Sequence, residues 1–282
     1  MKLWFSCLLL PLFSLAQMPE SDVWLFQLKP MKGALLPQVV AGMNISHRAG
    51  YDNQPCFTAD NKKLIYSSAR DNQNDLYVYT IRKKTTLPLH LTPESEFSPT
   101  VYNASLFSVV VEKDSTQTIH RMELEKGTTT AVLAPDSVGY YTWQNDDTLL
   151  YYKLTAPHSL WAYSLKRGEE WCLASNPTRA FRALSRTQFI YAIKDSGAVV
   201  FLEYDFLLHK AKIITRCEGA GEDFVWHPVM GIVRPKGSTL LYYDAKEQLW
   251  KQWCDLSGFG VKHISRITFS SDGKQLAISD IQ

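Results

Sequence analysis

The clearest pattern of apolar and polar positions lies between Tyr51 and Ile81. Apolar side chains in this segment fall into three short runs, which two polar segments separate. The runs are residues 55–57, 64–66 and 76–79. Asp60 and Asn61 suit the first turn, because Asx side chains bond the nearby backbone and tolerate left-handed geometry. The segment is therefore predicted to be a three-stranded β-meander.

The same plan of apolar run, Asx-rich turn, apolar run and polar loop recurs along the chain. Degenerate copies occupy residues 97–124, 140–163, 181–204 and 224–250. A last copy, residues 264–279, stops after two strands. Repeats of roughly 40 to 45 residues with four strands each are typical of β-propellers.

The strands that the last copy lacks are available at the other end of the chain. Residues 23–28 and 39–44 resemble the outer half of a repeat and precede the first complete copy. Pairing them with the C-terminal strands would close the ring and leave no open sheet edge. The sequence therefore predicts an all-β, six-bladed propeller with four antiparallel strands in each blade, formed as a single domain over residues 18–282.

The best-preserved copy, PxFTxDxKKLIYSSxRDxQNDLYVY, resembles the WD-like repeat of TolB-type β-propellers. The resemblance is specific at Gln54 to Tyr79 and at Ser265 to Ala277, and it is topological between them. It implies a small secreted six-bladed propeller, often periplasmic, that acts in protein or saccharide binding. Relatives include scaffolds and the propeller parts of peptidases and polysaccharide lyases, so the resemblance implies no particular reaction.

The first 17 residues predict a signal peptide. A short positive start at Met1 and Lys2 precedes an apolar run from Leu3 to Leu15, and Ser14-Leu15-Ala16 forms a cleavage site before Gln17. No other segment approaches the run of about 18 apolar residues that a membrane helix needs. We therefore expect a protein that is periplasmic or secreted and does not insert into the membrane.

Composition limits the classes of partner that we expect for this chain. Lysine and arginine total 30 against 28 acidic residues, a net charge of +2, which does not favour nucleic acid or an anionic membrane surface. Hydrophobic residues make up 45% of the chain, enough for the core of one compact domain. We expect a monomer that binds an envelope protein or peptide, or a glycan.

Motifs for catalysis are absent from the sequence. It contains no Gly-x-Ser-x-Gly, His-Glu-x-x-His or phosphate-binding loop, and its seven histidines are scattered singly. No close metal-ligand spacing joins the cysteines that follow the leader, namely Cys56, Cys172, Cys217 and Cys254. We predict no catalytic residue, metal or cofactor. The cysteines are expected to be buried free thiols, with Cys172 and Cys217 the first pair to test for a disulfide.

The candidate binding site follows from the register of the repeats. The innermost strand of each blade lines the channel, so residues just before it should ring one mouth. The aligned positions form a ring of mixed charge with one aromatic side chain. Arg179 also belongs to this ring. The predicted ligand-binding residues are Asp52, Gln54, Glu96, Tyr140, Arg182, Asp223 and Arg266.

Two interpretations of this ring stay open. Its carboxylates, arginines and aromatic side chain suit a polar ligand such as a peptide or a sugar. Alternatively, these groups satisfy one another and channel water, and so seal the axis. We favour an exported, non-enzymatic binding or scaffold propeller that engages a protein or glycan at one mouth. The alternative is a polysaccharide lyase or glycoside-acting enzyme that uses paired carboxylates, or a histidine with a bound cation.

Overall fold

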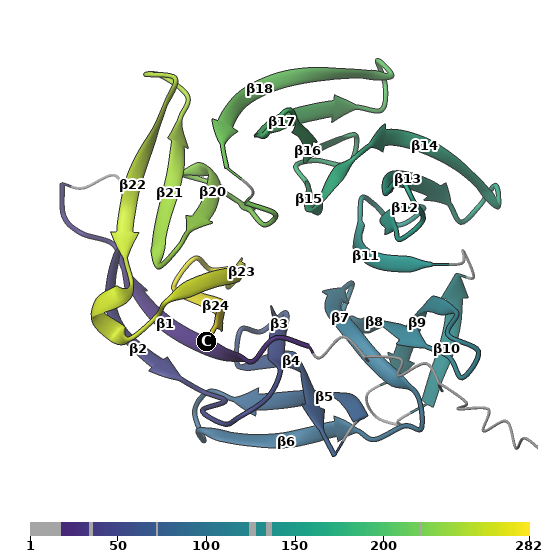
Figure 1. Ribbon diagram of the computed structural model, residues 1–282, viewed down its shortest axis with the longest axis horizontal. Coiled ribbons are helices and arrows are strands. Elements are labelled where there is room, and N and C mark those ends of the chain that lie inside the picture. The colour runs from purple at the N-terminus through teal and green to yellow at the C-terminus, as the bar shows by residue number, and fades with distance from the viewer. Residues whose placement is uncertain (1–17, 34–35, 72, 124–127, 134–136, 220) are drawn as a thin grey trace, which may run out of the picture.

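The computed structural model describes residues 18–33, 36–71, 73–123, 128–133, 137–219 and 221–282. Over these residues the chain forms six four-stranded antiparallel sheets arranged as blades around a common axis (Figure 1). The predicted six-bladed propeller is confirmed. The predicted leader, residues 1–17, lies outside the described residues.

Five blades use four consecutive strands each, from the axis outward. The first blade is β3 (Asp52–Phe57), β4 (Lys63–Arg70), β5 (Gln73–Thr80) and β6 (Thr85–His90). The second is β7 (Ser95–Tyr102), β8 (Ser105–Val111), β9 (Gln117–Glu123) and β10 (Thr128–Leu133). The third is β11 (Val138–Trp143), β12 (Thr148–Lys153), β13 (Ser159–Ser164) and β14 (Glu169–Ser175). The fourth is β15 (Pro177–Ala183), β16 (Gln188–Asp195), β17 (Ala198–Asp205) and β18 (Lys210–Glu218). The fifth is β19 (Val225–His227), β20 (Gly231–Lys236), β21 (Thr239–Asp244) and β22 (Leu249–Asp255).

The closing blade combines the two ends of the chain. Its strand order is β2 (Gln38–Asn44), β1 (Ser21–Lys29), β24 (Gln275–Ile281) and β23 (His263–Phe269). β1 pairs with β24 antiparallel, from Ser21 opposite Ile281 to Gln27 opposite Gln275. The backbone N–H of Gln282 donates to the carbonyl of Glu20 at 3.1 Å, a regular hydrogen-bond distance. The predicted closure of the ring is confirmed.

The middle strands of the blades are buried on both faces. Residues 64–68 of β4 and residues 149–152 of β12 are all buried. Neighbouring blades cover the two faces of each sheet, which explains why the sequence shows short continuous apolar runs rather than strict alternation. Clusters such as Phe26, Val233, Leu240 and Ile278, which join the closing blade to the fifth blade, form the core.

The polar turns of the repeat are stabilised by their own side chains. The hydroxyl of Thr58 donates to Asp60 Oδ1 at 2.7 Å, and the N–H of Lys62 donates to the same oxygen. In the last copy, Ser270 donates to Asp272 Oδ1 at 2.7 Å in the same way. The predicted role of these Asx residues as turn formers is confirmed.

Most inner strands contain an irregularity at the same place. Register shifts occur in β3, β7, β11, β15 and β23. In β3 and β7 the shift coincides with a left-handed residue, Gln54 (φ 58°) and Ser98 (φ 51°). Such bulges redirect side chains, and here they decide which residues face the axis.

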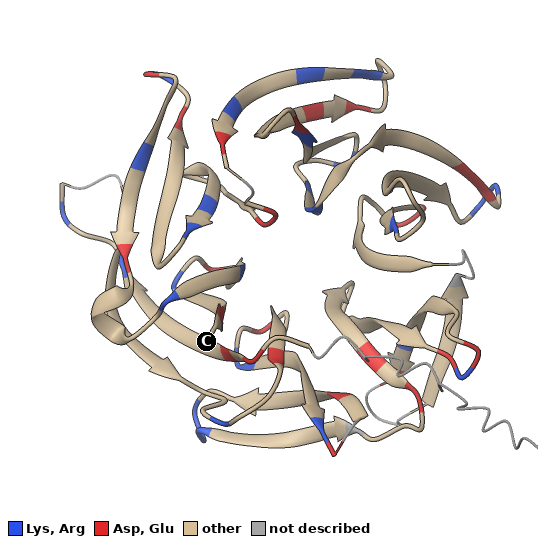
Figure 2. Cartoon of the chain, viewed as in Figure 1, with Lys and Arg blue, Asp and Glu red and all other residues tan. Residues whose placement is uncertain are grey.

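The four described cysteines are free, as expected. Their expected burial is wrong: Cys172 is exposed because it lies on β14, the outermost strand of its blade, and the other three are half-buried. Among the described residues, no helix has the length and hydropathy that crossing a membrane requires. Acidic and basic positions are interspersed over all the blades (Figure 2).

Candidate functional site

A cavity of about 210 Å³ lies where the inner edges of all six blades converge. Each blade contributes at least one lining residue. One representative from each is Gln54, Ser98, Tyr140, Arg182, Asp223 and Arg266. Five of the seven predicted ligand-binding residues therefore meet at this channel cavity, while Asp52 and Glu96 do not line it.

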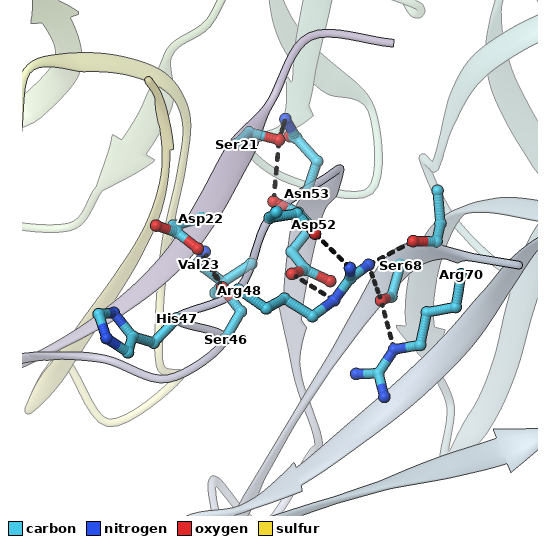
Figure 3. Close-up of polar contacts among 12 residues, drawn as sticks. Ser21, Asp22, Val23, Ser46, His47, Arg48, Asp52, Asn53, Ser68 and Arg70 are labelled. Atoms are coloured by element: carbon cyan, nitrogen blue, oxygen red, sulfur yellow. Dashed lines mark hydrogen bonds and ion pairs between the residues drawn. The ribbon is translucent and has the colours of Figure 1, made fainter. Parts of the chain in front are cut away.

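Asp52 instead belongs to a polar contact between the closing blade and the first blade (Figure 3). Its side chain is 0% exposed, and its Oδ2 lies 3.1 Å from Arg48 Nε. Arg48 also donates to the hydroxyl of Ser68 at 3.1 Å, and Ser21 donates to the backbone carbonyl of Asp52 at 3.1 Å. Regular alternation along β3 would put Asp52 and Gln54 on the same face. The register shift at the left-handed Gln54 breaks this alternation and separates Asp52 from the cavity-lining residues of β3.

Glu96 occupies the equivalent position on β7 and is 1% exposed. Its Oε1 accepts a hydrogen bond from the hydroxyl of Thr92, and its backbone carbonyl accepts one from Asn74 of the first blade. Burial, with a smaller contribution from the nearby Asp75 carboxylate, raises the pKa of Glu96 to about 7. Both Asp52 and Glu96 stand two residues before a left-handed residue, so the bulge places them between blades and aims later residues at the axis.

Arginine dominates the charge of the channel cavity. Arg179, Arg182 and Arg266 line it together with one carboxylate, Asp223. Arg179 belongs to the aligned ring, although it was not among the seven residues predicted to bind a ligand. It donates to the carbonyl of Ser265 at 2.8 Å.

Asp223 is fully engaged within the protein. Its Oδ1 accepts from the N–H of Phe224 and its Oδ2 from the N–H of Ile267, both at 3.0 Å, and Arg182 lies 3.8 Å away. The side chain is 6% exposed. Burial raises the pKa of Asp223, and the charges of Arg182 and Arg179 oppose that rise. Through these hydrogen bonds, Asp223 connects the fifth blade to the closing blade.

Gln54 is also satisfied internally. Its Oε1 accepts from the N–H of Ser98 at 2.6 Å and from the hydroxyl of Ser67 at 3.1 Å, which ties the first blade to the second. Arg266 differs, because its guanidinium lies 4.8 Å from the centre of the Tyr140 ring and, within the described part of the chain, forms no ion pair. The mouth thus combines residues that seal the ring with a cation that remains available.

Over the residues that the structure describes, no group of three or more His, Cys, Asp and Glu side chains gathers as a metal site. The described lining of the channel cavity contains no histidine. What the cavity offers chemically is a set of guanidinium donors beside an aromatic ring, a combination that recognises anionic groups.

No protein-family model matches the sequence, and comparison with curated proteins finds no significant match. Solved structures do match. A putative TolB from Agrobacterium tumefaciens superposes with a TM-score of 0.68 at 12% identity, over 94% of this chain and 99% of that one. A gluconolactonase from Xanthomonas campestris gives 0.64 at 11% identity, over 94% and 98%. An oligogalacturonate lyase in complex with manganese gives 0.60 at 12% identity, over 86% and 80%. The chain therefore has a TolB-like six-bladed propeller fold, a fold that carries more than one activity.

Proposed function

Starting from the TolB-like propeller fold, we propose that this chain is an exported, non-enzymatic binding propeller that engages a protein or glycan at one mouth of its channel. The observation that carries the proposal is the set of three arginines around the channel cavity, which is lined by one described carboxylate. That carboxylate is already bonded to two backbone N–H groups. Arg182 lies 3.8 Å from Asp223 and Arg179 lies 3.6 Å from Glu222, so Arg266 is the lining arginine without an acidic partner among the described residues. Its charge favours an anionic ligand.

Arg266 and Tyr140 are the groups best suited to contact this ligand. Arg266 is half-buried and rests on the Tyr140 ring, which limits its motion without using its hydrogen-bond donors on an acid. A guanidinium in this state can bind a carboxylate with two parallel hydrogen bonds. We infer that the partner, an envelope protein or peptide or else a glycan, presents an acidic group at the mouth.

The enzymatic alternative, a polysaccharide lyase or glycoside-acting enzyme, draws on the fold that this chain shares with a lyase and a lactonase. A general base needs a carboxylate or imidazole that can reach the substrate proton. Asp223 holds its two oxygens on backbone donors, and Glu96 lies between two blades. These positions support binding over catalysis as the role of the mouth.

The first prediction concerns Arg266. We expect Arg266→Ala to lose most capture of the partner in a pull-down from an envelope extract, because it removes the available cation. Its melting temperature should match that of the unmodified protein, since Arg266 has no ion pair among the described residues. The matched control is Arg186→Ala, an arginine with 75% of its side chain exposed in the turn at the other end of β15.

Retained capture by Arg266→Ala would contradict the proposal. Loss of the fold in Arg266→Ala would show instead that the ring of charges is structural. The same preparations, incubated with acidic polysaccharides and lactones, test the alternative: turnover that Asp223→Asn abolishes would favour an enzyme.

A further inference from the structure

A larger cavity, about 620 Å³ in volume, opens beside the channel mouth where the fourth, fifth and closing blades meet. β18 contributes Cys217 and Glu218, β20 contributes Arg234 and Lys236, and β22 contributes Trp250. Its volume lies within the range of small-molecule sites. Arg179 and Asp223 line both cavities, whereas Arg266 and Tyr140, the residues proposed to bind at the channel, do not line this inter-blade cavity.

Arg234 is the unusual residue of the inter-blade cavity. It is 5% exposed, and among the described residues no carboxylate lies within ion-pair distance of its guanidinium. Buried charges are nearly always paired, because removing an ion from water is costly. By contrast, Arg179 at the edge of the same cavity lies 3.6 Å from Glu222, which also pairs with Lys194.

The immediate contacts of Arg234 do not supply the missing negative charge. Its guanidinium donates to the sulfur of Cys217 and lies 5.8 Å from the centre of the Trp250 ring. Burial raises the pKa of the Cys217 thiol, although Arg234 opposes that rise, so the thiol is neutral near pH 7. At Gly221 the chain passes so close that a Cβ would overlap the guanidinium. The protein therefore makes room for a cation that it does not neutralise.

Two further groups extend the site. Lys236 follows Arg234 by two residues on β20, so both side chains lie on the same face. Lys236 is exposed at the rim, and it too has no described acidic partner. The indole N–H of Trp250 donates to the carbonyl of Arg216 at 3.2 Å, which fixes the orientation of the ring. Glu218 is exposed at the rim and lies beyond ion-pair distance of Arg234.

We propose that the inter-blade cavity binds a small organic carboxylate, with the carboxylate on Arg234 and Lys236 and a flat or apolar body against Trp250. Arginine forms paired hydrogen bonds with carboxylates, and aromatic rings bind flat groups by stacking. The same chemistry is presented by a free aromatic acid and by the C-terminal carboxylate of a peptide. The experiment distinguishes these two sources.

The test uses calorimetric titration and thermal shift on the full mature chain. The probes are phenylacetate, phenylacetamide, and a tetrapeptide that ends in phenylalanine with a free or an amidated C-terminus. We expect the acids to bind and their amides to bind about tenfold more weakly or not at all, because the charged hydrogen bonds are lost. Preference for phenylacetate over the peptide identifies a free acid as the ligand class, and the reverse preference identifies a peptide terminus.

Variants then locate the binding. Arg234→Met should weaken binding of the preferred acid by about tenfold or more, and Lys236→Ala by a few-fold. Arg266→Ala should leave it unchanged, so failure of the channel proposal and failure of this one give different results. Without ligand, Arg234→Met should melt at or above the temperature of the unmodified chain, because it removes an unpaired buried charge.

Three results would overturn the proposal: acid and amide binding equally, neither acid binding, or full binding by both Arg234→Met and Lys236→Ala. If Arg234→Met does not fold, the exposed Lys236→Ala decides by itself, and its unchanged affinity for the acid overturns the proposal.

Discussion

At the scale of single residues, burial separates charged side chains that look alike in the sequence. Glu96 lies between two blades and holds a neighbouring hydroxyl, Asp223 bonds two backbone N–H groups, and Arg266 faces the channel without an acid. The sequence alignment placed all three at one mouth. Their surroundings give them different roles, and those roles can be measured separately.

Glu96 should make stability depend on pH. Its pKa is about 7 in the folded protein and 4.5 ordinarily, so the folded state holds a proton that the unfolded chain releases. The stabilisation of the folded state by this proton is therefore complete below about pH 4.5 and is lost as the pH rises through 7. The free energy of unfolding should fall by up to about 3 kcal/mol over that interval.

Glu96→Gln is expected to remove this dependence, because the amide oxygen can still accept from Thr92 and has no proton to lose. Urea denaturation at pH 5 and pH 8 measures the difference, with the exposed Glu169→Gln as the control. A slope that is the same in Glu96→Gln as in the unmodified chain would assign the pH dependence to another group.

At the scale of elements, the closing blade is held by close packing of its outer strands. Gly42 on β2 faces Phe26 on β1, and a Cβ at Gly42 would overlap the Phe26 ring. That ring is fully buried and lies 5.3 Å from the ring of Phe259. The pairing of β1 with β2 therefore depends on a residue without a side chain.

Gly42→Ala should lower the free energy of unfolding by about 1–3 kcal/mol, the usual effect of overpacking. Urea denaturation measures the change. Gly258→Ala is a suitable control, because nothing lies within 4 Å of its added Cβ. Equal stability of the two variants would mean that Phe26 can move aside at little cost.

The elements could be predicted largely because blades are apolar on both faces, which leaves a strong repeating pattern of apolar runs such as residues 64–66 and 149–152. The bulges could not be predicted from the sequence, because Gln54 and Ser98 adopt left-handed geometry at positions where no glycine signals it. Asp52 and Glu96 were therefore assigned to the mouth. The inter-blade cavity was missed because Cys217, Arg234 and Trp250 come from three strands that no shared motif connects.

At the scale of the whole molecule, the ring depends on strands from both ends of the chain. β1 and β2 supply the outer half of the closing blade, and β1 covers the edge of β24. Without them, β24 would present unpaired backbone groups to solvent, and exposed edges of that kind favour association between chains. Closure of the ring should therefore affect both the stability of the fold and the tendency of chains to associate.

Deletion of residues 18–44 from a chain of residues 18–282 is expected to abolish cooperative thermal unfolding and to produce oligomers. Circular dichroism and size-exclusion chromatography measure the two effects. Adding a peptide of residues 18–44 should restore a monomeric complex, because a separate strand can complete an open sheet. A truncated chain that stays monomeric and melts cooperatively would show that closure is dispensable.

The pairing of β1 with β24 also sets the order in which the molecule can be assembled. β1 emerges from the ribosome before the five complete blades, and β24 emerges after them. Until β24 arrives, β1 has no partner on that edge and the ring stays open. If the chain is exported unfolded, the propeller can close only on the far side of the membrane, after β24 and the five complete blades before it have crossed.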